Sequence, residues 1–324
     1  MPRIIFFQNS PPYAKLLITV GVVILFLLLS SVISLILSIL IFHIDFSTLS
    51  DPLGNITKPG VLPALNLIQV ISAIGGFILP PFLLAFLFSS NIFDFLKLNR
   101  KTLVSSMVLV VIMIFVMTPF INWLMELNGR MVLPKFMHGI EEWMRKSEDQ
   151  NGELTKYFLD MHTIKDLLFN LFMVGLIPAI GEELVFRGVI QRLFGEWFKN
   201  KHIAIFVTAA IFSAFHMQFY GFVPRMLLGV VLGYLFVWSG SLWLPMLGHF
   251  VNNAAAVIMA YLFSNEISKL DPDKVGTEGS QWILAVVSGM LMIGIMIAIR
   301  SIEQYKKKKE LVVEPIEINE KFDT

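Results

Sequence analysis

Residues 167–188 read LLFNLFMVGLIPAIGEELVFRG, an apolar run that ends in two glutamates and an arginine. The run from Leu167 to Ile180 is of the kind that lies in lipid or in a buried core. Ionisable side chains at membrane depth cost at least ~2.5–3.5 kcal/mol each on insertion scales, so they are rare there and usually mark a functional site. The stretch therefore raises the question whether Glu182, Glu183 and Arg187 lie inside a membrane.

The composition of the whole chain is that of a polytopic membrane protein. Of its 324 residues, 56% are hydrophobic and only 15% are charged, and the mean hydropathy is +0.74. Soluble globular proteins carry about 25% charged residues. The net charge of +1 says nothing about nucleic acid, but the sequence has no basic patch interleaved with aromatics of the kind that such binding needs. The absence of cysteine excludes disulfides, thiolate nucleophiles and Cys-ligated metals.

Eight apolar segments are long enough to cross a bilayer, which takes about 20 residues in a helix. They are residues 16–42, 65–89, 103–124, 164–187, 202–218, 222–239, 242–264 and 281–300. The fourth to the seventh hold most of the polar residues within the spans. We therefore predict an all-α polytopic membrane protein with about eight transmembrane helices and a core four-helix catalytic bundle. The first segment is too long for the ~7–15-residue apolar region of a signal peptide, so we expect it to remain as a span.

Basic residues in the short loops predict the orientation, because cytoplasmic loops are enriched in Lys and Arg. One side collects Arg3, Lys15, Lys97, Arg100, Lys101, Arg192, Lys199, Lys201, Arg300 and Lys306 to Lys309. The other side has Lys58, Arg225, Lys269 and Lys274 in its shorter loops. We therefore expect a multi-pass protein of the plasma membrane with both termini in the cytoplasm.

Two segments are predicted to lie outside the membrane. The long loop 125–163 shows helical periodicity at Phe136, Ile140 and Trp143, which indicates an amphipathic element on the outer face. The tail from Lys306 onward is charged and contains proline, and we expect it to be disordered.

The stretch GEELVFRG separates its two acids on a helix. Glu183 and Arg187 are four residues apart, in the good orientation for an ion pair. Glu182 lies about 100° away on a neighbouring face and has no partner in its own helix. A free carboxylate suits a general base. A solvated helix end at the cytoplasmic surface would carry the same pattern.

Two further polar groups lie in the fifth and seventh spans. FSAFH, residues 212–216, places Phe212 and His216 on one helical face, although a lone His there is more often a hydrogen-bonded structural residue. HFVNN, residues 249–253, does the same for His249 and Asn253. Such a pair can hold helices together, and its N–H groups can equally bind a developing oxyanion.

These groups converge only if the fourth helix continues past Arg187 toward Arg192. At about 1.5 Å per residue, Glu182 then lies ~15 Å deep, His249 ~10 Å and His216 ~20 Å. With a water-filled cavity open to the cytoplasm, the bundle would present one free acid, two imidazoles and one amide. Those are the groups needed for hydrolysis inside a membrane.

The order E-E-x-x-x-R, F-x-x-x-H and H-x-x-x-N on successive core helices resembles the CPBP family. This family contains the type 2 CAAX prenyl endopeptidases and the bacteriocin-processing or self-immunity (Abi) membrane proteins. The similarity covers roughly residues 160–265, and no key polar position departs from the pattern. The resemblance implies an intramembrane endopeptidase with an eight-helix α fold.

The resemblance also implies roles for the site residues. Glu182 with His216 would activate the attacking water, and His249 with Asn253 would stabilise the tetrahedral oxyanion. The supporting residues would be Glu183, Arg187 and Phe212.

The expected cofactor is none, although proteins of this family are often called metalloproteases. H-E-x-x-H spacing is absent, so a glutamate-dependent mechanism fits the residues better than a zinc site. Zinc remains an alternative, with Glu182, His216 and His249 as ligands. The expected partners are the lipid bilayer and a peptide or membrane-protein substrate, and nothing indicates that the substrate is prenylated. Gly229 and Gly233 are spaced for packing within the bundle or between protomers, so the oligomeric state stays open.

Other classes of protein fit the sequence less well. A rhomboid-like serine protease needs G-x-S-G, and VWSGS at 237–241 has Val237 in place of the first glycine, which puts Ser239 in a loop. An aspartyl protease needs paired intramembrane aspartates, and the core spans hold none at a suitable depth. A transporter would use Pro178, Gly181 and Pro224 to break helices, but no internal repeat accompanies them. The remaining alternative is a non-catalytic bacteriocin-immunity or membrane scaffold protein with the same fold.

The expected organisation follows from these assignments. Residues 1–160 form the first three transmembrane helices and the outer loop, and residues 161–265 form the catalytic core. Residues 266–304 carry the last transmembrane helix, and residues 305–324 form a charged cytoplasmic tail.

Overall fold

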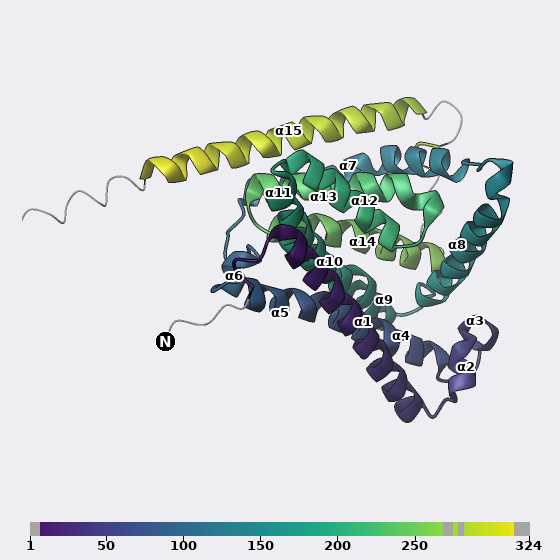
Figure 1. Cartoon of the computed structure of the whole chain (residues 1–324). Coiled ribbons are helices and arrows are strands. Elements are labelled where there is room, and N and C mark those ends of the chain that lie inside the picture. The colour runs from purple at the N-terminus through teal and green to yellow at the C-terminus, as the bar shows by residue number, and fades with distance from the viewer. Residues whose placement is uncertain (1–6, 268–274, 278–281, 314–324) are drawn as a thin grey trace, which may run out of the picture.

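The computed structural model describes residues 7–267, 275–277 and 282–313, and these residues contain helices and no strand (Figure 1). Within these described residues, seven helical segments are long and apolar enough to cross a membrane. They are Pro12–Phe42, Val61–Phe88, Val104–Gly129, Ile164–Phe198, Phe219–Ser239, Trp243–Ser264 and Trp282–Lys309. The prediction of an all-α polytopic membrane protein is confirmed. The predicted fifth span, 202–218, forms the shorter helix α12 (Lys201–Phe215).

The helices follow one another with few long connections. In the first half of the chain they are α1 (Pro12–Phe42), α2 (Phe46–Ser50), α3 (Pro52–Asn55), α4 (Val61–Ala73), η1 (Ile74–Ile78), α5 (Leu79–Phe88), α6 (Ile92–Phe95), α7 (Val104–Gly129), η2 (Lys135–Met137) and α8 (His138–Phe158). In the second half they are α9 (Ile164–Asn170), η3 (Leu171–Leu176), α10 (Ile177–Glu183), η4 (Leu184–Ile190), α11 (Gln191–Phe198), α12, η5 (Phe219–Gly221), α13 (Phe222–Ser239), α14 (Trp243–Ser264) and α15 (Trp282–Val313).

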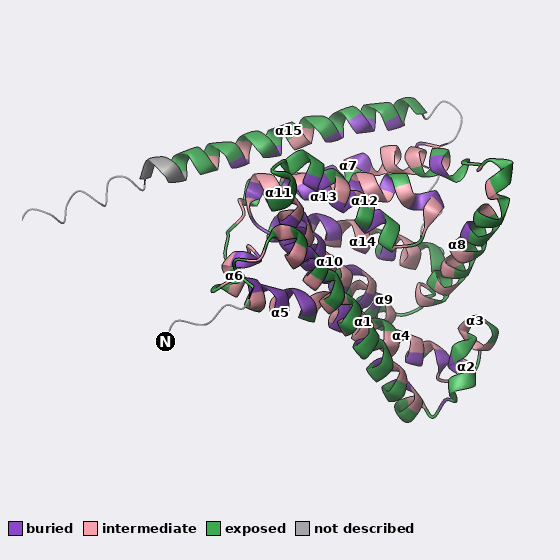
Figure 2. Ribbon diagram, viewed as in Figure 1, coloured by how far each residue is buried: buried purple, intermediate pink, exposed green. Residues whose placement is uncertain are grey.

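Buried residues gather in the middle helices, and the outer helices expose apolar side chains. Figure 2 shows α10 and its neighbours largely buried, while α1 and α15 are exposed along much of their length. Leu17, Leu28 and Leu40 of α1 are 72%, 61% and 63% exposed. A helix with an exposed apolar face is suited to lipid contact. The described helices therefore include a buried interior and an outer helix, α1, that is suited to a lipid environment.

The fourth span is one continuous helix of 35 residues from Ile164 to Phe198. It begins with a capping box between Thr163 and Asp166, and it includes two π-helical segments, η3 and η4. The helix continues past Arg187, as convergence of the polar groups requires. The stretch α10, with both glutamates, lies between the two π-helical segments, and such segments are frequent at functional sites.

Helix α12 ends at Phe215, earlier than predicted, and the chain turns through Met217, whose φ is +54°. Polar side chains hold the turn. Asn128 of α7 donates to the carbonyl of Phe219, and Glu148 of α8 accepts from the amide of Tyr220. Such bonds matter because backbone groups at membrane depth need partners within the protein.

The glycines of α13 pack inside the bundle rather than on its surface. A Cβ on Gly233 would lie 2.9 Å from Ile205 Cγ2, and one on Gly229 would lie 3.0 Å from Ala209 Cβ. Their carbonyls also accept hydrogen bonds, from Gln191 at 3.2 Å to Gly233 and from Arg187 at 2.9 Å to Gly229. The small-residue spacing is thus used for close helix contact within this chain.

The prediction that the tail is disordered from Lys306 is wrong for the residues up to Val313, which continue α15. Lys and Glu are good helix formers, and the lysines find acceptors on the bundle. Lys306 donates to the carbonyl of Lys101 and Lys307 to that of Val237. The rest of the tail, 314–324, lies outside the described residues.

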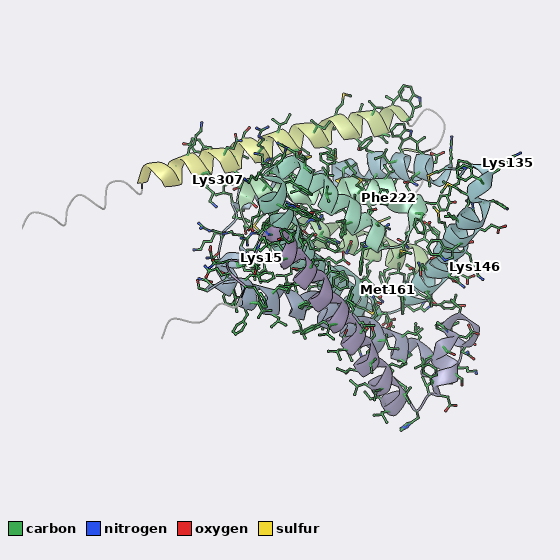
Figure 3. The ribbon with its side chains drawn as sticks, in the orientation of Figure 1. Lys15, Lys135, Lys146, Met161, Phe222 and Lys307 are labelled. Atoms are coloured by element: carbon green, nitrogen blue, oxygen red, sulfur yellow. The ribbon has the colours of Figure 1, made fainter. Side chains whose placement is uncertain are left out.

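Lysines from the two predicted sides of the membrane lie toward opposite ends of the molecule. Figure 3 shows Lys307 at the end opposite to Lys135 and Lys146. Helix α8 lies across that second end. Trp143, one of the residues that predicted an amphipathic element there, is half exposed. Which end faces the cytoplasm stays a prediction.

Candidate active site

Glu183 and Arg187 form the predicted ion pair, and both side chains are fully buried. Arg187 Nη1 donates to Glu183 Oε1 at 2.7 Å. Arg187 Nη2 donates to the carbonyl of Gly229 at 2.9 Å, and its guanidinium lies 4.8 Å from the ring centroid of Phe212. The arginine therefore connects the fourth span to α12 and α13 as well as neutralising Glu183.

His249 of α14 donates through Nδ1 to the same Glu183 Oε1, at 2.9 Å. This contact between two helices was not predicted. It fixes the orientation of a ring that is 3% exposed and directs Nε2 away from Glu183. His249 Nε2 lies 3.8 Å from Glu182 Oε2.

His216, the first residue after the end of α12, approaches the carboxylate of Glu182. Its Nδ1 donates to the carbonyl of Phe212 at 2.8 Å, because a carbonyl can only accept. Its Nε2 lies 3.8 Å from Glu182 Oε2. The hydrogen bond at Nδ1 thus fixes the imidazole ring of His216, and Nε2 is directed toward Glu182.

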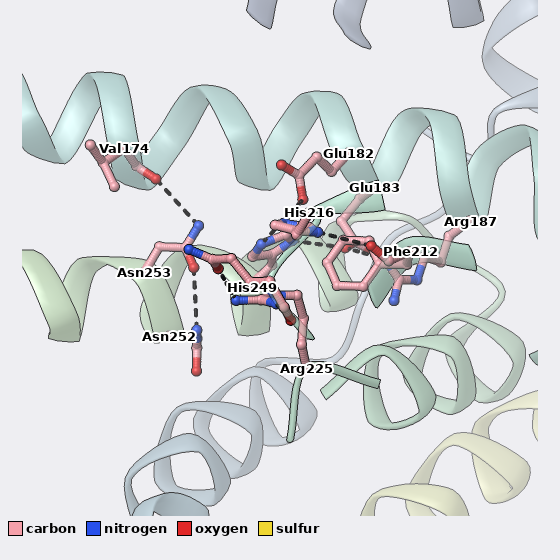
Figure 4. Close-up of polar contacts among 11 residues, drawn as sticks. Val174, Glu182, Glu183, Arg187, Phe212, His216, Arg225, His249, Asn252 and Asn253 are labelled. Carbon is pink, nitrogen blue, oxygen red and sulfur yellow. Dashed lines mark hydrogen bonds and ion pairs between the residues drawn. The ribbon is translucent and has the colours of Figure 1, made fainter. Parts of the chain in front are cut away.

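Glu182 is the point on which the two imidazoles converge (Figure 4). Its side chain is 15% exposed, and Oε2 is buried with no hydrogen-bond partner among the described residues. The acid without a partner in its own helix therefore lies beside two histidines from two other helices. The sequence spacing predicts that Glu182 and Glu183 have different roles. The fold then shows that the two imidazoles lie beside Glu182.

Asn253 lies one helical turn beyond His249 and contacts the fourth span. Its Nδ2 donates to the carbonyl of Val174 at 3.3 Å, and its Oδ1 accepts from Asn252 at 3.2 Å. Pro178 has no N–H to give to the carbonyl four residues earlier, which is that of Val174. The amide of Asn253 thus links α14 to the backbone of η3 just before Pro178.

Phe212 packs against the guanidinium of Arg187 and against the imidazole of His216. Its ring centroid is 4.9 Å from that of His216, 5.9 Å from that of His249 and 5.2 Å from that of Phe186. The predicted supporting residue therefore separates the ion pair from His216 and shapes the apolar wall of the site.

Arg225 is a neighbour of the site that the sequence reasoning missed. It was assigned to an outer loop as a basic residue, yet it lies in the first turn of α13, partly buried, and appears in Figure 4 close to the histidines. Its partner is Gln218, on the same turn as His216. The sequence did hold a signal for this placement. Arg225 follows His216 by nine residues, and the short turn between α12 and α13 brings it back toward the site.

The described residues contain no group of three or more His, Cys, Asp or Glu side chains placed to hold a metal ion. Glu182, His216 and His249 have the donor types that zinc takes, and both Nδ1 atoms are held by the protein. Neighbouring ligand atoms of a tetrahedral zinc lie about 3.3 Å apart. The two Nε2 atoms are each 3.8 Å from Glu182 Oε2. The three side chains would therefore have to move closer together to bind a zinc ion.

Comparison with known proteins places this site within a family segment. Residues 164–255 match the family model described as Type II CAAX prenyl endopeptidase Rce1-like, a range that includes all seven predicted site residues. The match confirms the resemblance over this segment.

A curated relative was also found. The "Uncharacterized protein YpbD" of Bacillus subtilis (strain 168) is 26% identical over 119 residues, which is 36% of this chain and 56% of that protein. The match thus spans about half of the relative's length. No solved structure matches the chain.

Proposed function

We propose that this chain is an intramembrane endopeptidase that hydrolyses peptide bonds with a water activated by Glu182 and His216. The observation that carries the proposal is the convergence of two Nε2 atoms on Glu182 Oε2, each at 3.8 Å. The family match over residues 164–255 supports protease chemistry in this segment. The apolar helices around the site support a substrate that is reached from within a membrane.

The geometry suits activation of a water. A water at about 2.8 Å from Glu182 Oε2 can lie at the same distance from His216 Nε2. Because Nδ1 of His216 is a donor to Phe212, Nε2 carries the lone pair when the ring is neutral. The acid and the imidazole can therefore both accept a water proton, and such general-base catalysis contributes about 10²–10⁴-fold.

The other two groups suit stabilisation of the tetrahedral intermediate. With hydrogens on both ring nitrogens, His249 keeps its Nδ1 bond to Glu183 and offers Nε2–H to the oxyanion. Asn253 has a second amide hydrogen besides the one directed at Val174. When the C–N bond breaks, the proton taken from the water passes to the departing amine nitrogen.

The test compares membrane fractions of cells that produce the normal chain, Glu182→Gln or Glu196→Gln. Glu196 is an exposed acid on α11, so it provides a matched control. We expect peptide termini generated by cleavage in the normal and Glu196→Gln cells and their loss with Glu182→Gln. Identical termini in all three, at equal protein levels, would favour the scaffold alternative.

Metal dependence is tested on the purified protein. We expect activity to survive a membrane-permeant chelator and elemental analysis to find no stoichiometric zinc. One zinc per chain, lost in Glu182→Ala, would replace the glutamate mechanism while keeping the protease.

A further inference from the structure

Asn252, the residue before Asn253, makes a side-chain contact that the proposed reaction leaves unexplained. Its Nδ2 donates to Asn253 Oδ1 at 3.2 Å. Side chains of consecutive residues leave a helix about 100° apart and do not normally face each other. The two amides must bend toward one another, so this bond is a specific contact rather than a result of helical spacing.

The other surroundings of Asn252 are mostly apolar. Its side chain lines a cavity of about 440 Å³ between α7 and α14, whose wall includes Met117, Ala255 and Met259. Within the described part of the chain, the Asn252 side chain makes no other hydrogen bond. An amide in apolar surroundings costs free energy unless it is hydrogen-bonded. The bond to Asn253 is therefore the polar contact that this side chain is placed to make.

Two hydrogen bonds together determine which way the Asn253 amide points. The carbonyl of Val174 can only accept, so the atom that faces it at 3.3 Å is Asn253 Nδ2. Oδ1 then faces Asn252, which donates to it. With one hydrogen of Nδ2 directed at Val174, the other is available to an oxyanion. Rotation of the amide by half a turn would replace this donor with an acceptor.

We propose that Asn252 is a positioning residue, which holds Asn253 Oδ1 so that Asn253 Nδ2 donates a hydrogen bond to the tetrahedral intermediate. This inference rests on the proposed function and adds to it a residue that acts through Asn253. Stabilisation of an oxyanion depends on donors that are oriented before the reaction begins. A bond that fixes the amide therefore contributes to turnover without contact to the reacting atoms.

The variant Asn252→Asp keeps the shape of the side chain and makes its hydrogen bonding depend on pH. An ionised carboxylate can only accept, so it should turn the Asn253 amide round, whereas a protonated carboxyl can donate to Oδ1. The described residues that line the cavity include no titratable side chain. The charged or titratable side chains of the candidate site are Glu182, Glu183, Arg187, His216 and His249. Their titration is common to both chains, so activity is expressed as the ratio to the normal chain at the same pH.

The first measurement observes the Asn253 amide and needs no substrate. Asparagine side chains are labelled with ¹⁵N, and the NMR signals of Asn253 in detergent are those that disappear in Asn253→Asp. We expect these signals to shift in Asn252→Asp at neutral pH and to return toward their normal positions on acidification. Asn122→Asp, which changes the wall of the same cavity in the same way, should leave them in place.

The second measurement is the cleavage of a substrate identified from its termini in membrane fractions. Asn252→Asp should be about 10²–10³-fold slower than the normal chain at neutral pH, as for the loss of one oxyanion donor, and should recover most of that factor on acidification. Asn252→Leu has no donor at any pH, so its ratio should stay low and constant. Asn122→Asp should keep a ratio near that of the normal chain. Thermal melts check folding, and Asn252→Leu replaces Asn252→Asp in both measurements if the latter is unfolded.

Unchanged Asn253 signals in Asn252→Asp would overturn the inference, and so would turnover equal to that of the normal chain. A loss of turnover that Asn122→Asp shares, or that acidification does not relieve, would also overturn it, because the effect would then not depend on the donor. If the amide reorients and the normal chain cleaves nothing, Asn252 still orients Asn253 and the proposed function is wrong. Cleavage by the normal chain with unchanged signals would show the reverse.

Discussion

Glu183 Oε1 accepts hydrogen bonds from both Arg187 and His249, so one buried oxygen links the ion pair to the candidate catalytic histidine. The pair itself was predictable, because residues four apart on a helix are neighbours. The bond to His249 was not, because it depends on how two helices are placed. Glu182 and Glu183, adjacent in the sequence, consequently have different surroundings.

These different surroundings predict different effects of substitution. Arg187→Ala leaves the fully buried Glu183 without its counter-charge, so it should lower the free energy of unfolding by ~3–5 kcal/mol. Glu182→Gln should melt like the normal protein and lose activity. Thermal unfolding in detergent measures both.

A matched control for Arg187→Ala is Arg130→Ala, which removes an exposed pair with Glu126 and should change stability by about 0–1 kcal/mol. An unfolded Glu182→Gln together with a stable Arg187→Ala would show that the two roles are reversed.

Asn253 and Glu182 should differ in the activity that remains after substitution. Losing one oxyanion donor typically costs ~10²–10³ in turnover, so Asn253→Ala should be slow yet active. Losing the general base should cost at least ~10²–10⁴. Initial rates on one substrate decide the order, and a faster Glu182→Ala than Asn253→Ala would contradict the assignment.

At the scale of elements, hydropathy located the spans well and failed at the end of α12. Residues 213–218 contain neither glycine nor proline, so the apolar pattern gives no stop signal there. The helix ends because bonds from Asn128 and Glu148 hold the following turn. The π-helical segments η3 and η4 could not be predicted from the sequence either. The spacing of apolar residues in a helix follows a period of 3.6 residues, and it does not reveal where a turn is locally wider.

The contact between α12 and α13 gives a prediction on stability. Gly233→Ala would place a Cβ 2.9 Å from Ile205 Cγ2 and should destabilise by about 1–3 kcal/mol. A Cβ added at Gly294 of α15 would meet nothing within 4 Å, so Gly294→Ala should be neutral or stabilising by up to ~1 kcal/mol. Melting of the two variants side by side checks the comparison, and an equal response would mean that the glycines of α13 are not closely packed.

The turn after α12 gives a second prediction for the elements. Glu148→Ala removes the acceptor for the amide of Tyr220 and should loosen the segment that carries His216. Because the chain has no cysteine, Met217→Cys can be labelled alone, and its reaction with a maleimide should become several-fold faster. Asp149→Ala, an exposed neighbour on α8, is the control, and equal rates in both would contradict the proposed restraint.

At the scale of the whole molecule, the distribution of basic residues predicts which end faces the cytoplasm. Reporter fusions after Lys309 and in the loop 125–163 should lie on opposite sides of the membrane, with Lys309 inside. Reports from the same side would contradict this topology. Orientation depends on the charges of the loops and on the membrane itself, so it follows from the sequence rather than from the packing of the helices.

The short helix α12 also has a consequence for the surrounding lipid. Its 15 residues rise about 22 Å, some 8 Å less than the ~30 Å hydrocarbon layer, while Phe206, Ile211 and Phe215 expose apolar side chains. A bilayer can match such an edge by thinning locally, at a cost that grows with the hydrophobic mismatch. Turnover in vesicles should therefore rise as the acyl chains become shorter and fall as they lengthen. The thickness of the membrane would then regulate the proposed endopeptidase, because water reaches His216 more easily where the lipid layer is thinnest.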